Sequence, residues 1–159
     1  NVKRVIRALE FYKKTGTKIS EHNETESQKE SPYNFEYFVL CDDRAKLYDK
    51  IDRRIDIMLE DGLVDEVRGL VAEGYDRRSL VSMQGLGYKE IIDYLQGRCS
   101  FDEAVYTLKR DTRHFAKRQI TWFKREKHVT WVNKNEYESE ADILEYMLER
   151  LRVKEIIQR

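Results

Sequence analysis

The sequence has few of the residues that crosslink small proteins or hold metals in them. Its two cysteines, Cys41 and Cys99, are far apart and have no third thiol or neighbouring histidine. This excludes a cysteine-based zinc site and a disulfide framework, and it is typical of a reducing compartment. No stretch approaches the roughly 18 consecutive apolar residues that a membrane-spanning helix needs, and no signal peptide is visible. We therefore expect a cytoplasmic protein without a membrane partner.

The sequence also lacks a complete reaction centre. It contains no Ser-His-Asp set, no Cys-His pair and no Walker phosphate-binding loop. The histidines His22, His114 and His128 have no partner at metal-ligand spacing, and His114 is best interpreted as a polar surface residue. We expect binding groups in this chain, but neither catalytic residues nor a metal site.

What is present indicates a helical, charged protein with one core. The 159 residues are 40% hydrophobic, which is enough for one domain or a tightly joined pair. Charged residues make up 38% of the chain, and the net charge is zero. The charge is unevenly spread, because the region around Arg110 is basic while Asn133–Glu149 is rich in acid. Overall neutrality is therefore no argument against a nucleic-acid partner.

Hydrophobic spacing and capping residues predict a mostly helical chain with two strands. The expected helices are Val2–Thr15, one capped by Asp42 or Asp43 and ended by Gly62, one from Leu63 to Gly74, one from Gly87 to Gly97, one from Phe101 into the basic segment that ends at Lys127, and Glu140–Ile157. The expected strands are Phe35–Leu40, interpreted as buried, and His128–Val132. Residues 17–34 are polar and predicted without firm structure, and Tyr75–Leu80 are predicted as loop. The stripes expected to face inward are Val5, Ile6, Leu9 and Tyr12 on the first helix, and Val105, Leu108, Phe115 and Ile120 on the basic helix.

The basic helix is the most informative segment. Eight cationic residues lie between Lys109 and Lys127, against two anionic ones. Aromatic, amide and hydroxyl side chains are interleaved with these charges. Phosphates need cations and unstacked bases need flat faces, so the mixture suits RNA better than a protein partner. The alternative is a solvated basic face whose apolar stripe packs in the core.

Three further segments carry cations in patterns with two interpretations. Arg44, Lys50, Arg53 and Arg54 could hold a polyphosphate, or could pair with aspartates on the same helix. The segment Gln84–Lys89 places two glycines before a helix N-terminus, where free N–H groups attract phosphate, although most such glycines mark ordinary turns. The third segment, with Lys3, Arg4 and Arg7, could be a helix edge that meets phosphates or a solvated face.

Taken in order, four segments resemble the C-terminal half of the tRNA dimethylallyltransferase (tRNA isopentenyltransferase) family. They are KRVIRALEFYKKTG (Lys3–Gly16), DRAKLYDKIDRRIDIMLEDGLVDEV (Asp43–Val67), SMQGLGYKEIIDYL (Ser82–Leu95) and KRDTRHFAKRQITWF (Lys109–Phe123). The resemblance covers nearly the whole chain. It implies transfer of a dimethylallyl group from dimethylallyl diphosphate to the exocyclic N6 of the adenine next to the anticodon of certain tRNAs.

The resemblance also implies a fold. It is an α/β, P-loop-kinase-like core with a helical insertion, seen here mainly through its helices. The family's phosphate loop, its Mg²⁺ site and its catalytic aspartate lie in an N-terminal half that this chain lacks. We expect residues 1–34 to be the end of the insertion and a polar connector, and residues 35–159 to be the C-terminal part of the core. The expected partners are a tRNA anticodon stem-loop and dimethylallyl diphosphate, and the expected state is a monomer.

Carried over by position, the resemblance assigns individual residues. Arg54 matches the arginine that contacts the substrate diphosphate, whereas Lys50 stands where the family usually has arginine and is left out. The positions that match tRNA-contacting segments are Lys3, Arg4, Val5, Ile6, Arg7, Gln84, Gly85, Leu86, Gly87, Tyr88, Lys89, Lys117, Arg118, Gln119, Ile120, Thr121, Trp122, Phe123 and Lys124. The target adenine would be flipped out of its stack to present N6.

Two alternatives of a different class stay open at this point. The chain could be a non-catalytic RNA-binding module whose phosphate contacts only position the RNA. It could also be a helical protein-interaction domain whose basic helix meets an acidic partner. Without the missing half, the strands predicted here would leave open sheet edges, so we expect the chain to be marginally stable when expressed alone.

Overall fold

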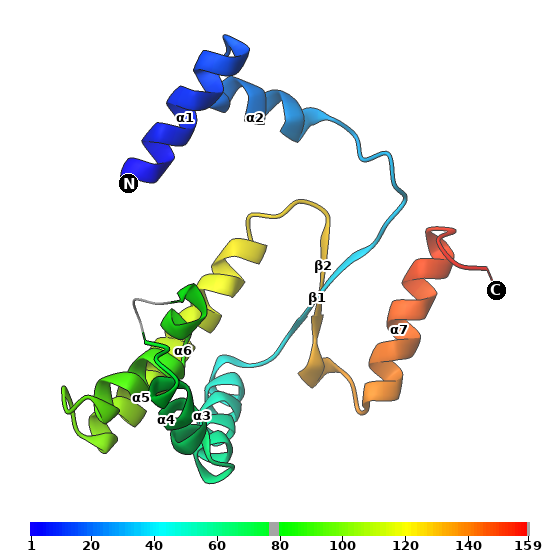
Figure 1. The fold of residues 1–159 in the computed structure, drawn as a ribbon. Coiled ribbons are helices and arrows are strands. Elements are labelled where there is room, and N and C mark those ends of the chain that lie inside the picture. Colours follow the sequence, from blue (N-terminus) through cyan, green and yellow to red (C-terminus); the bar gives the residue numbers. More distant parts are fainter. Residues whose placement is uncertain (77–79, 159) are drawn as a thin grey trace.

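The computed structural model describes residues 1–76 and 80–158, so residues 77–79 of the predicted loop lie outside the described part. Helices dominate, with one small sheet, as expected for part of an α/β fold (Figure 1). The helices are α1 (Val2–Thr15), α2 (Ile19–Gln28), α3 (Arg44–Glu60), α4 (Leu63–Ala72), α5 (Tyr88–Leu95), α6 (Phe101–Phe123) and α7 (Glu140–Val153). The strands are β1 (Tyr37–Cys41) and β2 (Val129–Asn133), and the 3₁₀ turns are η1 (Val81–Gln84) and η2 (Lys134–Glu136).

The core lies among α3, α4, α5 and α6. Its buried members are Ile55, Leu63, Val67, Met83, Ile91, Ile92 and Leu108. The helices α3 and α6 run antiparallel, because partner positions rise along α3 while they fall along α6: Asp52 pairs with Arg113, and Asp56 pairs with Lys109. This bundle supports the first half of α6, and the second half extends toward the sheet (Figure 1).

Local signals set the helix ends in this bundle. Ser100 Oγ accepts the Glu103 N–H at 3.2 Å while the Glu103 carboxylate accepts the Ser100 N–H at 2.8 Å, which is the predicted capping box. Gly87 precedes α5 with φ of 101°, a conformation that costs a residue with a Cβ. The predicted helix starts at Phe101 and after Gly87 are therefore confirmed.

The sheet is a parallel pair in which Tyr37 lies opposite Val129 and Cys41 lies opposite Asn133. A network centred on Glu36 joins this pair to α7. The Glu36 Oε1 accepts from Thr130 Oγ1 at 2.6 Å and from Arg150 at 2.8 Å, and Lys154 reaches the second oxygen. In Figure 1 the sheet stands between α7 and the end of α6.

Several predictions about elements were wrong. The segment 17–34 contains α2, which lacks an apolar stripe and is supported instead by ion pairs such as Lys18 with Glu21 at 3.4 Å and Lys29 with Glu26 at 2.5 Å. The final helix ends at Val153 rather than Ile157, and Glu155 then adopts φ of 55°. Both strands begin later than predicted, at Tyr37 and Val129.

Burial also differs from the prediction in three places. The predicted inward stripe of α1 is exposed, because α1 packs against α2 and stands away from the core (Figure 1). Phe115 is 45% exposed, because the second half of α6 extends past the bundle. Strand β1 buries Val39 but leaves Leu40 exposed, so it is not the buried strand expected. Asp43 occupies the N-cap position of α3, but its side chain makes no capping hydrogen bond.

None of the helices in the described ranges is long and apolar enough to cross a membrane.

Candidate RNA and diphosphate site

The cations of α6 fall into two groups along the helix. In the first half, Lys109 pairs with Asp56 at 2.5 Å and Arg113 pairs with Asp52 at 2.7 Å. Arg110 pairs with Asp111 at 2.9 Å. These three charges are compensated within the fold, and the pairs of Lys109 and Arg113 bind α6 to α3. Neither interpretation of the basic helix in the sequence predicts these pairs.

The second half of α6 and the turn after it carry cations of a different kind. Lys117, Arg118, Lys124, Arg125 and Lys127 are exposed, and none has an ion-pair partner among residues 1–76 and 80–158. Like charges gathered without compensation repel one another, and they lower the free energy of a bound polyanion. This half therefore has the electrostatics of an anion-binding surface.

An open hollow of about 500 Å³ lies on this half of α6. It is lined by His114, Lys117, Arg118, Thr121, Trp122 and Arg125. The Trp122 side chain is 53% exposed, so a flat face remains available for stacking beside the cations. Exposed aromatic rings next to cations bind unstacked bases and their phosphates in single-stranded nucleic acids.

Sequence reasoning missed two residues of this hollow. The sequence pattern predicts an ordinary surface histidine at His114 and gives Arg125 no role. Both lie on the helix face of Arg118, because His114 is four residues before it and Arg125 is seven after it. That spacing was the signal that could have found them.

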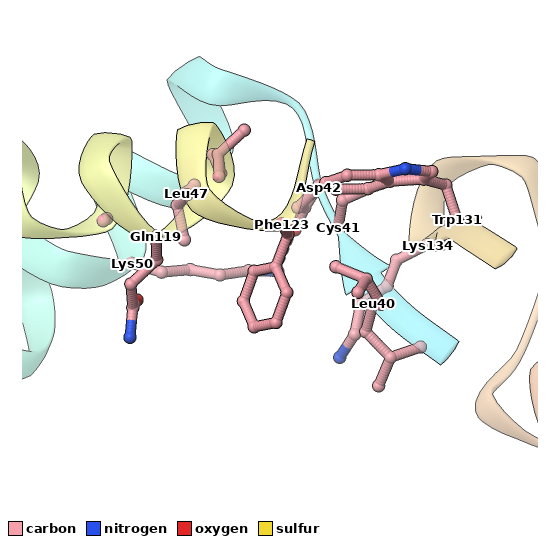
Figure 2. Close-up of a pocket in the computed structure, with 12 residues that line it drawn as sticks. Leu40, Cys41, Asp42, Leu47, Lys50, Gln119, Phe123, Trp131 and Lys134 are labelled. Carbon is pink, nitrogen blue, oxygen red and sulfur yellow. Dashed lines mark hydrogen bonds and ion pairs between the residues drawn. The ribbon is translucent and has the colours of Figure 1, made fainter. Parts of the chain in front are cut away.

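The run Lys117–Lys124 does not form one surface. Gln119 and Phe123 point to the opposite side of α6, into a second hollow of about 270 Å³ at the face of the sheet, where Val39, Cys41 and Trp131 line it (Figure 2). The Phe123 ring meets the Tyr37 ring edge-on at 6.2 Å. The half-buried Ile120 lines the same hollow. Residues of the predicted run therefore divide between an outward cationic face and an inward apolar face.

The glycine turn between η1 and α5 reaches the cationic face of α6 through Lys89. Lys89 Nζ lies 3.6 Å from Asp111 Oδ2 on α6. Asp111 shares its helix face with Arg118, seven residues on, at an axial separation of about 10 Å. The Gly85–Gly87 turn therefore lies near the side of α6 that carries Arg118.

The turn itself is closely packed. A Cβ on Gly85 would lie 3.1 Å from the Ser82 carbonyl oxygen, and Gly87 has a positive φ. Tyr88 is half-buried, and its hydroxyl donates to the Glu66 carboxylate, a hydrogen bond that raises the pKa of Tyr88. Leu86 packs against the core. The part of the turn that remains exposed is Gln84 and Gly85.

The segment Lys3–Arg7 is not brought to this surface. Its residues are exposed on α1, which packs against α2 through contacts such as the Phe11 and His22 rings, 5.1 Å apart. In Figure 1 the α1–α2 hairpin stands apart from the bundle. The structure therefore joins two of the three predicted RNA-contacting segments and leaves this one separate.

Arg54 differs from the other cations of α3. Lys50 pairs with Asp42 at 2.5 Å and Arg53 pairs with Asp49 at 2.8 Å. Arg54 is exposed, and no ion pair or hydrogen bond to its side chain occurs within the described parts of the chain. It lies one helical turn after Lys50, on the same flank of α3. The guanidinium is therefore available to an anion.

Asp42 anchors the start of α3 beside these cations. It accepts from Lys50 and, at 2.7 Å, from Asn135 Nδ2 on η2. These contacts lower the pKa of Asp42 to about 2. Its charge is thus committed to holding β1, α3 and η2 together.

No metal site is formed by the described residues, since no three of their histidine, cysteine, aspartate or glutamate side chains group as ligands. The resemblance places the Mg²⁺ ligands outside this chain, and residues 1–76 and 80–158 offer no ligand set of their own.

Comparisons with known proteins agree with the motifs. A family profile described as IPP transferase matches residues 1–126. The chain is 61% identical over 157 residues to a tRNA dimethylallyltransferase of Lachnoclostridium phytofermentans, covering 99% of this chain and 50% of that protein. It is 56% identical over 145 residues to the enzyme of the same name from Acetivibrio thermocellus, covering 91% and 46%.

Among solved structures, the full-length tRNA isopentenylpyrophosphate transferase of Bacillus halodurans matches with a TM-score of 0.73 and 40% identity, covering 98% of this chain and 47% of that one. A tRNA isopentenylpyrophosphate transferase of Staphylococcus epidermidis matches with a TM-score of 0.72 and 38% identity, covering 96% and 49%. The chain spans about half the length of the curated relatives it matches.

Proposed function

The chain belongs to the IPP transferase family, and on that premise we propose that it forms the RNA-holding part of a tRNA dimethylallyltransferase. In the complete protein, a dimethylallyl group would pass from dimethylallyl diphosphate to N6 of an adenine in the anticodon loop. The observation that carries the proposal is the split of α6 into a compensated half and an uncompensated half. In the uncompensated half, exposed cations line a hollow together with the exposed Trp122 ring.

The RNA would lie along the outward face of α6. Lys117 and Arg118 would bind phosphates, and Trp122 would offer its ring to a base. The Gly85–Gly87 turn, which is linked to α6 through Lys89, would meet the same loop. Holding the loop at two points leaves a base between them free to leave the stack, which it must do before its exocyclic amine can reach an electrophile.

Arg54 would bind the substrate diphosphate. In the reaction, the N6 lone pair forms a bond to C1 of the dimethylallyl group while the bond between C1 and the diphosphate oxygen breaks. Negative charge then grows on the leaving diphosphate, and N6 loses a proton to a base outside this chain. A guanidinium that is not engaged by a protein carboxylate can stabilise that charge, and Arg54 meets this condition where Lys50 and Arg53 do not.

The remaining sheet and the Mg²⁺ site are assigned to the other half of the protein. The parallel pairing of β1 and β2 suits a P-loop-kinase-like sheet with further parallel strands. The apolar hollow beside Val39 and Trp131 has the position of a surface that such a half would cover (Figure 2). Mg²⁺ would neutralise the diphosphate there, with ligands that this chain does not supply.

A transfer assay tests this function. The full-length protein is incubated with labelled dimethylallyl diphosphate and an anticodon stem-loop that carries adenine at the target position. A matched stem-loop carries purine, which lacks the exocyclic amine. Label in the first RNA and not in the second is the expected result. Binding without transfer to either RNA would favour the non-catalytic RNA-binding module, and binding to an acidic peptide in place of RNA would favour the protein-interaction domain.

A further inference from the structure

Lys89 differs from the other cations predicted to touch RNA, because carboxylates flank it on two sides. Its Nζ lies 3.2 Å from Glu90 Oε1 and 3.6 Å from Asp111 Oδ2. Its side chain is only 28% exposed. The charge of a cation held between two carboxylates is largely compensated, so little of it is available to a phosphate. Phosphate binding is therefore a poor account of this residue.

Glu90 connects Lys89 to the glycine turn. It is 4% exposed and is the buried charged residue of the described core. Its Oε2 accepts the Gly87 N–H at 3.0 Å, while its buried Oε1 has no hydrogen bond within the described parts of the chain and is compensated by Lys89. One carboxylate thus holds both the backbone of the turn and the cation that reaches α6.

Asp111 connects Lys89 to the RNA-facing surface. It lies on the α6 face that continues through Arg118 and Trp122, about two and three helical turns further on. It also accepts from Arg110 Nε at 2.9 Å, which fixes the carboxylate on the helix. A continuous chain of contacts therefore runs from Gly87 through Glu90 and Lys89 to Asp111, on the helix face that carries Arg118.

We propose that Glu90, Lys89 and Asp111 form a positioning bridge that sets the register of the Gly85–Gly87 turn relative to Arg118 and Trp122. The bridge makes no phosphate contact of its own. It acts by keeping the two RNA-contacting segments at the spacing of one RNA loop. The inference rests on the proposed function, because it assumes that both segments engage the same RNA.

An electrostatic model and a positioning model predict opposite changes in RNA affinity when Asp111 is substituted. If electrostatics alone governs this region, Asp111→Asn removes a negative charge near a polyanion and strengthens binding. If Asp111 positions the turn, the same substitution weakens binding. For the full-length protein and an anticodon stem-loop we expect weakening of roughly fivefold or more, at every salt concentration. The slope of log K against log salt should equal that of the wild type, since no phosphate contact is lost.

Glu126→Gln is the matched control. Glu126 is exposed at the other end of the same basic segment and has no ion pair within the described ranges. Its loss should leave binding equal or make it tighter. The double variant Lys89→Gln/Glu90→Gln removes one charge of each sign, so it leaves no buried carboxylate unpaired. It should weaken binding with an unchanged slope, and it serves if Asp111→Asn proves too unstable at the assay temperature.

The bridge is wrong if Asp111→Asn binds as tightly as the wild type or more tightly. It is also wrong if the double variant loses about 0.7–0.9 from the slope, the value of one phosphate contact. Thermal unfolding of each variant shows whether binding is measured on folded protein. Failure of the wild type to bind the stem-loop would instead reject the proposed function, so the two failures are distinguishable.

Discussion

Removing Lys117 and Arg118 together should lower both the affinity for an anticodon stem-loop and its dependence on salt. Each phosphate contact contributes about 0.7–0.9 to the slope of log K against log salt. Both side chains lack an ion-pair partner among the described residues, so their charge is available to RNA. Lys117→Gln/Arg118→Gln in the full-length protein should therefore reduce the slope by about 1.4–1.8.

The same figures give the expected loss of affinity. If counterion release accounts for the whole difference, K falls roughly 25- to 60-fold at 0.1 M salt. Between 50 and 200 mM salt the ratio of the wild-type binding constant to that of the variant should fall about tenfold. Fluorescence anisotropy of a labelled stem-loop, titrated at several salt concentrations, measures both quantities.

A paired cation on the same helix provides the control. Lys109→Gln removes the same charge, but Lys109 is engaged by Asp56 at 2.5 Å. It should leave the slope at the wild-type value while lowering the melting temperature slightly. An unchanged slope in the double variant, or an equal change in Lys109→Gln, would refute the division of α6 into compensated and available charges.

Three further predictions concern other parts of the chain. Arg54→Ala in the full-length protein should reduce turnover by about 10²-fold or more while stem-loop affinity stays near wild type. Arg53→Ala is the control, because the charge of Arg53 is already paired. Equal losses of binding and turnover in Arg54→Ala would remove Arg54 from the diphosphate role. Glu36→Gln should cost about 2–3 kcal/mol of unfolding free energy, measured by urea unfolding. Burial raises the pKa of Glu36, but hydrogen bonds from Lys154, Thr130 and Arg150 outweigh it and lower the pKa to about 2. This contribution to the unfolding free energy should therefore be complete above about pH 4.5 and disappear as pH falls toward 2. A difference in unfolding free energy between wild type and variant that persists at pH 2 contradicts the pairing. Trp122 fluorescence should be measured in a Trp131→Phe variant, so that Trp131 does not contribute to the signal. The stem-loop should quench it and an acidic peptide should not, and equal quenching by both would favour a protein partner.

The sequence predicted those elements whose ends depend on neighbouring residues. The Ser100–Glu103 box starts α6 where expected, and Gly16, with φ of 73°, ends α1. The polar helix α2 was missed because helix prediction relied on an apolar stripe, while α2 is stabilised by charge pairs and contacts with α1. Phe115 was placed in the core because its spacing fits the stripe of Leu108. Spacing cannot show that the bundle stops before the helix does.

The candidate site also has a part that the sequence predicts and a part that it does not. Family motifs identified the segments, but they assigned contiguous runs, whereas a helix presents consecutive residues to different sides. Gln119 and Phe123 therefore turn inward while Arg118 and Trp122 turn outward. The pairing of Lys89 with Asp111 joins residues on different helices, and no local pattern in the sequence contains it.

The 23-residue length of α6 has a mechanical consequence. The helix is packed in the bundle near Leu108 and against β1 through Phe123. The direction in which each side chain of its second half points therefore depends on the number of residues that separate it from Leu108. Inserting one residue between Leu108 and the cationic second half would rotate that half by about 100° about the helix axis. Its charges would then no longer lie on the side shared with the glycine turn. Inserting four would advance it by about 6 Å but restore its phase to within about 40°. The rotation of the side chains about the helix axis, more than their shift along it, therefore limits which insertions this helix can tolerate.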